Sequence, residues 1–426
     1  MRHSGLWIPV LRVLYSNILF TPALPTAYYA HGNATEQCTT PHADDLKYCE
    51  DAVFWDIYDQ AAGPRTARRA LISCDAGRKG WNTVMGPMLD PEPKGSLWVM
   101  DVSVGAAPTH LVLEGFPPNH DFHPLGLDIA PAHGGEPSHL FIVNHARGRT
   151  CIEQFSVSPR GQAVATYVRT LDSPQFMAAN SLALTSPTSF LVTNDHRFTR
   201  RLSLPFNHVL PIAESILSLP LGWAAHVMLD IQEEGAKDEV PGSAASRAHA
   251  NMTVNIAASS IPFANGVAIS PARDMVAIAS TTTAEVRLYE IGDPAGPASF
   301  EASLAGLKLN SKDRNPVLFL PDNVHFADDG SLIVAGHPNF PKIDALAKGG
   351  SAPAGSWVVR VAERGAGAGF AASRSGRPRY DITTLYQSNG AQFQSSTTGL
   401  HDIESGLLIV TGLYADPGVL VCTSAS

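Results

Sequence analysis

The sequence predicts an all-β protein built as a β-propeller. Short runs rich in valine, isoleucine and leucine recur through the chain, each bounded by glycine, proline, asparagine or aspartate, which is typical of strands. The 35 glycines and 32 prolines favour tight turns over long helices. A unit made of a turn, a small apolar strand and a polar end recurs, for example at residues 330–337 and 406–412. Repetition of this unit favours radial closure over a sandwich.

The expected strands are short and follow one another along most of the chain. They lie at residues 96–100, 140–143, 190–192, 275–279, 286–289, 332–334, 357–359 and 407–410. With 426 residues, 44% of them hydrophobic, the chain has ample material for a core. A propeller holds that length as one domain, because each blade adds to a single ring.

The charge balance excludes one class of partner. The net charge is −9, and no run rich in lysine or arginine occurs, so the sequence predicts no nucleic-acid partner. An acidic balance suits solubility and cation binding, although it is not specific for either.

The N-terminal segment resembles a targeting sequence. Residues 1–30 carry basic residues, then an apolar stretch at 13–20, then small residues, which predicts either a signal peptide or a retained anchor with membrane association. Arg12 and Asn17 argue against a spanning helix. Asn33 and Asn251 begin glycosylation sequons, which matter only in a secreted chain. We expect a secreted protein.

The cysteine pattern leaves the pairing open. The five cysteines are Cys38, Cys49, Cys74, Cys151 and Cys422, and none forms a CxxC pair, which argues against a zinc knuckle. An odd count leaves at least one free thiol if the other four pair. Cys38 and Cys422 lie near opposite ends of the chain, which a propeller would bring together, so a bridge there would close the ring.

Polar residues stand beside small apolar residues at several predicted strand ends. They are Glu50, Asp51, Asn180, Asn265, Asp322 and Asn323. Burial of such groups is costly without a partner, and a set made only of carboxylate and amide oxygens suits a hard cation such as calcium. Taken singly, each of these segments is more often a plain turn. A propeller axis is where residues of different blades converge.

Together these segments resemble the serum paraoxonase/arylesterase family. The resemblance is carried by residues 262–271, 322–323 and 336–339, together with 143–145 and 193–196, in the family's order. It runs from about Cys38 to Cys422. The resemblance implies a six-bladed propeller over residues 38–426, with two calcium ions in its tunnel.

The resemblance also implies a ligand set for each ion. The residues matching the upper, catalytic calcium are Glu50, Asn180, Asn265, Asp322 and Asn323. The deeper calcium would use Asp51, a carbonyl near Leu127 and an aspartate whose place is taken here by Ser181. The second site therefore loses a carboxylate.

Further roles follow from the same resemblance. It implies a Cys38–Cys422 disulfide, whereas Cys49 and Cys74 have no counterpart and either pair with each other or remain buried thiols. His145 matches one of two family histidines proposed to activate water. Leu125 stands where the second is expected, with His123 two residues earlier. The expected substrate pocket contains Leu125, Phe263 and His337.

The favoured function is calcium-dependent hydrolysis of a small hydrophobic lactone or aryl ester. Calcium would polarise the carbonyl, and His145, Glu50 or Asp322 would deprotonate water. No Gly-x-Ser-x-Gly elbow marks a serine nucleophile. One alternative is a non-hydrolytic propeller enzyme acting on a hydrophobic metabolite, as strictosidine-synthase-like relatives of the fold do. The other is a calcium-stabilised binding protein without catalysis.

Overall fold

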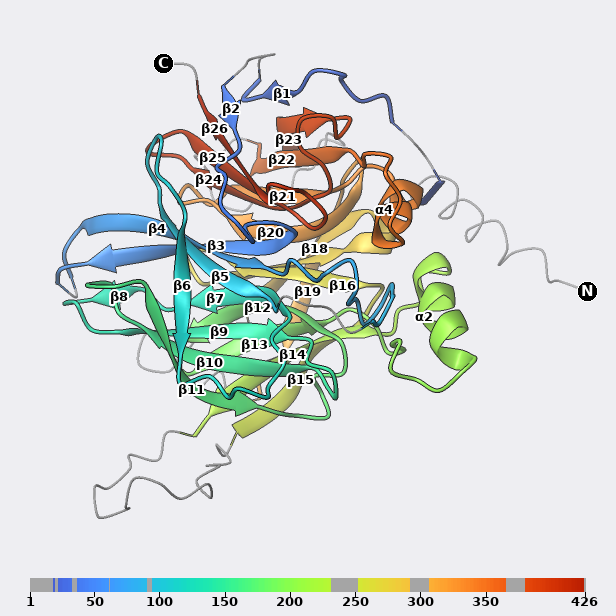
Figure 1. Cartoon of the computed structure of the whole chain (residues 1–426), viewed down its shortest axis with the longest axis horizontal. Coiled ribbons are helices and arrows are strands. Elements are labelled where there is room, and N and C mark those ends of the chain that lie inside the picture. The colour runs from blue at the N-terminus through green and yellow to red at the C-terminus, as the bar shows by residue number, and fades with distance from the viewer. Residues whose placement is uncertain are drawn as a thin grey trace, which may run out of the picture.

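Strands dominate the computed structural model of the chain (Figure 1). It describes residues 18–19, 22–32, 37–60, 62–89, 94–230, 252–291, 306–364 and 380–424. Every strand predicted from the sequence coincides with an observed one, from β5 (Ser96–Asp101) to β25 (Leu407–Gly412). The short apolar runs pair as antiparallel neighbours, so their backbone groups are satisfied within sheets.

The first part of the chain forms a nine-stranded sheet of order β7-β9-β10-β11-β6-β5-β4-β3-β8. Its strands are β3 (Cys49–Tyr58), β4 (Arg65–Cys74), β5, β6 (Thr109–Glu114), β7 (Pro124–Ile129), β8 (Ala132–His133), β9 (Ser138–Asn144), β10 (Cys151–Val157) and β11 (Val164–Leu171). It consists of two antiparallel units, β3-β4-β5-β6 and β7-β9-β10-β11, which are joined by parallel pairing of β6 with β11. The two-residue strand β8 pairs in parallel with β3 at the other edge.

Two four-stranded sheets follow in sequence order. The first contains β12 (Ala179–Ser186), β13 (Ser189–Asn194), β14 (Gly222–Leu229) and β15 (Met252–Ile261). The second contains β16 (Ala264–Ile269), β17 (Met275–Ser280), β18 (Glu285–Ile291) and β19 (Leu309–Pro316), with a short 3₁₀ turn, η2 (Thr281–Thr283), between β17 and β18. Each is a plain antiparallel meander.

The last two sheets each include a strand from the N-terminal segment. The five-stranded sheet contains β1 (Tyr29–Ala30), β20 (Leu320–Phe326), β21 (Leu332–His337), β22 (Ser356–Glu363) and β23 (Tyr380–Ser388). The final four-stranded sheet contains β2 (Cys38–Thr39), β24 (Ser396–Asp402), β25 and β26 (Val419–Thr423). Two helices, α2 (Phe206–Ile216) and α4 (Phe340–Ala347), lie on the same side of the sheets (Figure 1).

The first strand of each sheet unit belongs to a closed ring. β3 contacts β7, and the contacts continue through β12, β16, β20 and β24 back to β3. Apolar clusters fill the spaces between neighbouring units, for example where Ala277, Val334 and Trp357 meet. The all-β class and a propeller-like arrangement of sheets are therefore confirmed. The count of six blades stays a prediction, because the first two units share one continuous sheet.

The ends of the chain close this ring. β2 pairs with β26, and Cys38 lies opposite Cys422 in that ladder. The two cysteines form a disulfide across a sequence separation of 384 residues. The predicted Cys38–Cys422 bridge is therefore confirmed, and a second disulfide joins Cys49 to Cys74. Cys151 is a buried free thiol.

The N-terminal segment contributes to the folded body before Cys38. β1 pairs with β23, and Tyr28 packs against Tyr386 with ring centroids 6.0 Å apart. Residues 29–30, which fall within the predicted 1–30 targeting segment, thus pair with a strand of the folded body. None of the helices in the described ranges is long and apolar enough to span a membrane. Asn33 and Asn251, the predicted glycosylation sites, lie outside the described residues.

Candidate active site

The six strands of the closed ring, which we call the inner strands, each carry a β-bulge. They are β3, β7, β12, β16, β20 and β24. In every case the inner strand has one residue more than its partner strand over the same stretch. The bulged segments contain Glu50, Leu125–Gly126, Asn180–Ser181, Asn265–Gly266, Asp322–Asn323 and Thr397. A bulge bends its strand and re-aims a side chain, and bulges are common beside active sites. The predicted calcium ligands of the upper site therefore share one structural position, repeated around the axis.

Two of these bulges need glycine because their backbone lies against the bulge of the neighbouring inner strand, which leaves no room for a side chain. A Cβ on Gly126 would lie 2.5 Å from the Cα of Ser181, and a Cβ on Gly266 would lie 2.5 Å from the Cα of Asn323. Both distances are shorter than any ordinary contact, so these glycines allow neighbouring inner strands to approach closely.

The bulges line a cavity of about 100 Å³. Of the predicted upper-calcium ligands, Glu50, Asn180, Asn265 and Asp322 line it directly. The predicted pocket residues Leu125, Phe263 and His337 line it as well, and so does His145. Asn323 is buried beside Glu50, to which its side chain is hydrogen-bonded. The structure thus brings together residues that the sequence spreads over more than 270 positions.

The asparagine side chains are held with their oxygens unpaired. Asn180 Nδ2 donates to Asp195 Oδ2 at 3.1 Å, and Asn265 Nδ2 donates to Thr281 Oγ1 at 3.1 Å. Asn323 Nδ2 donates to Glu50 Oε1 at 3.1 Å. The Oδ1 atoms of all three, together with Glu50 Oε2, are buried without a hydrogen-bond partner.

Such oxygens fit a hard cation. A buried acceptor without a partner is costly, and carboxylate and amide oxygens are the ligands that calcium takes. Burial raises the pKa of Glu50 well above its usual range, and the negative charges of Asp51 and Asp322 raise it further. A divalent cation among these acids would favour their ionised forms. The residues present at the predicted upper site therefore fit calcium.

The residues of the predicted second calcium site do not fit a calcium ion. Asp51 already accepts hydrogen bonds from Thr398 Oγ1 at 2.7 Å and from the Leu127 N–H at 3.3 Å. His325 Nε2 lies 3.5 Å from Asp51 Oδ1. Ser181 supplies a neutral hydroxyl, which accepts from the Val267 N–H. Both Asp51 oxygens therefore already accept hydrogen bonds, and Ser181 supplies no charge, so the predicted set lacks the carboxylates of a calcium site.

The two histidines nearest the family pattern are both held firmly. His145 Nδ1 lies 2.8 Å from Thr83 Oγ1, and its Nε2 lies 2.7 Å from the Ala179 carbonyl oxygen. Burial, with a smaller contribution from the positive charge of Arg201, lowers the pKa of His145 to about 4. His337 Nε2 lies 2.8 Å from Asp322 Oδ2, so it steadies a predicted ligand.

His123 has a different environment. Its Nδ1 lies 2.9 Å from Asp75 Oδ2, and its Nε2 is buried without a partner. Its ring stacks on Trp81 at 5.3 Å between centroids. His123, Asp75 and Trp81 all line the cavity. Asp75 and Trp81 were not identified from the sequence.

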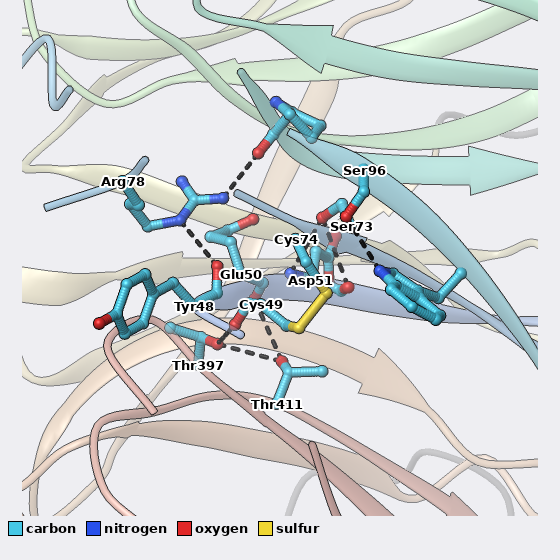
Figure 2. Close-up of a disulfide and its surroundings, with 12 residues drawn as sticks. Tyr48, Cys49, Glu50, Asp51, Ser73, Cys74, Arg78, Ser96, Thr397 and Thr411 are labelled. Carbon is cyan, nitrogen blue, oxygen red and sulfur yellow. Dashed lines mark hydrogen bonds between the residues drawn. A yellow bond between two sulfur atoms is a disulfide. The ribbon is translucent and has the colours of Figure 1, made fainter. Parts of the chain in front are cut away.

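Arg78 is a third cavity residue that sequence reasoning missed. Its guanidinium is buried in the cavity wall and donates to the carbonyl oxygens of Tyr48 and Pro124. One available signal was the repeated pair of a cysteine followed by an acid, Cys49–Glu50 and Cys74–Asp75. Figure 2 shows the disulfide between these cysteines, with Glu50 and Arg78 beside it.

Sequence comparison finds one family and related proteins. A family model described as Arylesterase matches residues 83–224 and 248–416. The serum paraoxonase/lactonase 3 of Oryctolagus cuniculus is 24% identical over 333 residues, covering 77% of this chain and 77% of that protein. The serum paraoxonase/arylesterase 2 of Canis lupus familiaris is 25% identical over 299 residues, covering 69% of each.

Structural comparison gives weaker likenesses. A luciferin-regenerating enzyme has a TM-score of 0.45 at 11% identity, covering 88% of this chain and 96% of that one. A periplasmic gluconolactonase from Pseudomonas aeruginosa has a TM-score of 0.41 at 10% identity, covering 81% and 75%. At these scores we rest the fold on the strand pairing of the chain itself.

Proposed function

Since the chain belongs to the arylesterase family, we propose that it hydrolyses lactones or aryl esters with the help of a bound calcium ion. We place this chemistry on the axis of a six-bladed propeller, in which the nine-stranded sheet supplies two blades. Family membership supports an esterase- or lactonase-type hydrolase.

The observation that carries the calcium proposal is the set of unpaired oxygens. Glu50 Oε2 and the Oδ1 atoms of Asn180, Asn265 and Asn323 are buried without partners. Together with Asp322 they would hold the ion. A bound calcium supplies a Lewis acid that polarises the substrate carbonyl. The amide donors of the asparagines are already engaged, which fixes the oxygens in place before any ion arrives.

The rest of the cavity favours an apolar substrate. Its wall includes Trp81, Met85 and Phe263, and α4 contributes Phe340 and Ile343. Apolar side chains around a few polar groups are typical of sites for small hydrophobic ligands. An aryl ester or a lactone with a hydrocarbon substituent fits this pattern. Its carbonyl group would lie at the predicted calcium ligands, and its hydrocarbon part would contact the apolar wall.

We place the protein in the secretory pathway. The described residues contain two disulfides, and disulfides persist mainly in oxidising compartments. Membrane association through residues 1–17 stays a prediction, since that segment lies outside the described residues.

A substrate panel tests the reaction class. The purified protein is assayed in calcium buffer with aliphatic lactones, phenyl acetate and a phosphotriester. Turnover of a lactone or phenyl acetate supports the proposal. Absence of turnover on every ester and lactone contradicts it and leaves the alternatives, a non-hydrolytic enzyme or a calcium-stabilised binding protein.

A further inference from the structure

We propose that His123, oriented by Asp75, is the general base that activates water in this chain. The inference rests on the proposed hydrolysis and names the residue that carries its proton transfer. It replaces neither the calcium site nor the substrate class.

The geometry fixes the tautomer of His123. Asp75 Oδ2 is 2.9 Å from His123 Nδ1, and a carboxylate there accepts the Nδ1 proton. Nε2 then keeps its lone pair. This nitrogen is buried and has no partner, in a residue that lines the same cavity as Glu50 and Asp322. A base held by a third group, with its reactive atom unengaged, is the arrangement that general-base catalysis requires.

Further hydrogen bonds hold His123 and Asp75 in place. The His123 N–H donates to Asn144 Oδ1 at 2.9 Å, and its carbonyl oxygen accepts from the His145 N–H at 3.0 Å. Asp75 Oδ1 accepts from the Gly77 N–H at 2.8 Å, which leaves Oδ2 for the imidazole. Ordered supports of this kind keep a catalytic group in one geometry.

His145 is less suited to the same step. Its Nε2 is hydrogen-bonded to a carbonyl oxygen and must carry a proton there, while its Nδ1 accepts from Thr83. Both ring nitrogens are occupied, so His145 would have to break a buried hydrogen bond to receive a proton from water. Leu125, at the bulge itself, offers no base. His123, two residues earlier, has a free Nε2 in this wall. His337 also has a free ring nitrogen, Nδ1, but its Nε2 is bonded to Asp322, a predicted calcium ligand.

The proton balance of the step is simple. A water oxygen bonds to the substrate carbonyl carbon as His123 Nε2 takes one water proton, which gives a tetrahedral intermediate and an imidazolium paired with Asp75. The ester C–O bond then breaks, and the proton on Nε2 moves to the leaving oxygen. The products are an acid and an alcohol, or a single hydroxy acid from a lactone, and His123 returns to its starting form.

The test compares variants of the calcium-loaded full chain on the best substrate of the panel. His123→Gln should lower kcat by about 10²- to 10⁴-fold, the usual share of general-base catalysis. KM and the calorimetric calcium affinity should stay within about twofold of wild type, since His123 is not a predicted ligand. Asp75→Asn should lower kcat in the same direction, because it favours the wrong tautomer. His133→Gln, an exposed histidine on β8, is the matched control.

Chemical rescue separates a catalytic from a structural role. Added imidazole should restore part of the kcat of His123→Ala and none of the activity of Asp322→Ala. Near-wild-type kcat in both His123→Gln and Asp75→Asn, with an active wild type, overturns this inference and leaves the proposed function intact. If His123→Gln fails to fold, Asp75→Asn and the rescue of His123→Ala decide. A wild type without esterase or lactonase turnover removes both claims.

Discussion

Cys49 and Cys74 face each other at the ends of β3 and β4, and their disulfide holds two cavity acids in place. Glu50 follows one cysteine and Asp75 follows the other. The bond therefore ties a predicted calcium ligand to the carboxylate that orients His123. This link gives a role to two cysteines that have no counterpart in the family pattern.

Removing the Cys49–Cys74 bond should affect both stability and catalysis. A crosslink over a separation of 25 residues is worth about 3 kcal/mol in the chain-entropy model. Cys49→Ser/Cys74→Ser should therefore melt at a lower temperature and lose kcat, because Glu50 and Asp75 become less well ordered. Calorimetry and steady-state kinetics measure the two effects.

The Cys38–Cys422 bond provides the comparison. It joins the outer strands β2 and β26, and its long loop makes it worth about 5 kcal/mol at the upper end of the measured range. Cys38→Ser/Cys422→Ser should lose stability while kcat stays near wild type below the melting transition. Equal loss of kcat in both double variants would contradict the distinction.

The glycines in the β-bulges allow a steric test of the predicted calcium site. Gly266→Ala would place a Cβ 2.8 Å from the Asp322 carbonyl oxygen and 2.5 Å from Asn323 Cα. The ligand segment must then shift, so we expect weaker calcium binding and a lower melting temperature. Gly148→Ala is the control, since nothing lies within 4 Å of its Cβ position. Calorimetric titration of both variants decides, and equal affinities would refute the ring of contacts.

Asp322 should contribute charge to calcium binding. Asp322→Asn keeps the shape of the side chain and removes its negative charge. Even outer-shell changes cost metal sites about 10- to 100-fold in affinity, so we expect calcium affinity to fall by at least about tenfold. Asp101→Asn removes the same charge from an exposed strand end and should leave affinity unchanged. An unchanged affinity in Asp322→Asn would remove this residue from the site.

His145 should make the folded state sensitive to acid. Its pKa is about 4 in the folded chain, against a usual value of 6.5. As the pH falls below 6.5, the unfolded chain binds a proton that the folded chain excludes, so stability is lost in the direction of acid. Between pH 8 and pH 5 the loss is about 2 kcal/mol.

Denaturant unfolding at the two pH values measures this loss. His145→Gln removes the titrating group, so its free energy of unfolding should fall less between pH 8 and pH 5 than that of wild type. The variant should also be less stable than wild type at pH 8, where Thr83 and Ala179 lose a matched partner. Identical pH dependence in both proteins would show that His145 is not protected from protons.

Much of the fold was visible in the sequence because strands follow local patterns. Residues 332–334 and 407–410 are short apolar runs between turns, and each became a strand. The family predicted from residues 262–271 and the other segments is confirmed by the family-model match. The blade units could not be counted this way, since pairing of β6 with β11 depends on tertiary structure.

The site was only partly predictable. The sequence could indicate which residues converge on the cavity, because carboxylates and amides recur at the ends of apolar strands, where a buried polar group needs a partner. Their role as calcium ligands stays a prediction. Asp75 and Arg78 were missed because they lie in a turn, where polar residues are ordinary. The engagement of both His145 nitrogens depends on Thr83 and Ala179, which lie far from it in the sequence. Hydrogen-bond partners of this kind are not encoded by local pattern.

The most direct test of a calcium-dependent hydrolase is turnover measured against free calcium. The rate on the best lactone or aryl ester is recorded in chelator and then across a calcium titration, beside calorimetric binding on the same preparation. We predict no turnover in chelator and full recovery on adding calcium. The free calcium concentration that gives half the maximal rate should equal the calorimetric dissociation constant, and both should be higher in Asp322→Asn. Full turnover in chelator, by protein shown to be free of calcium, would contradict the account.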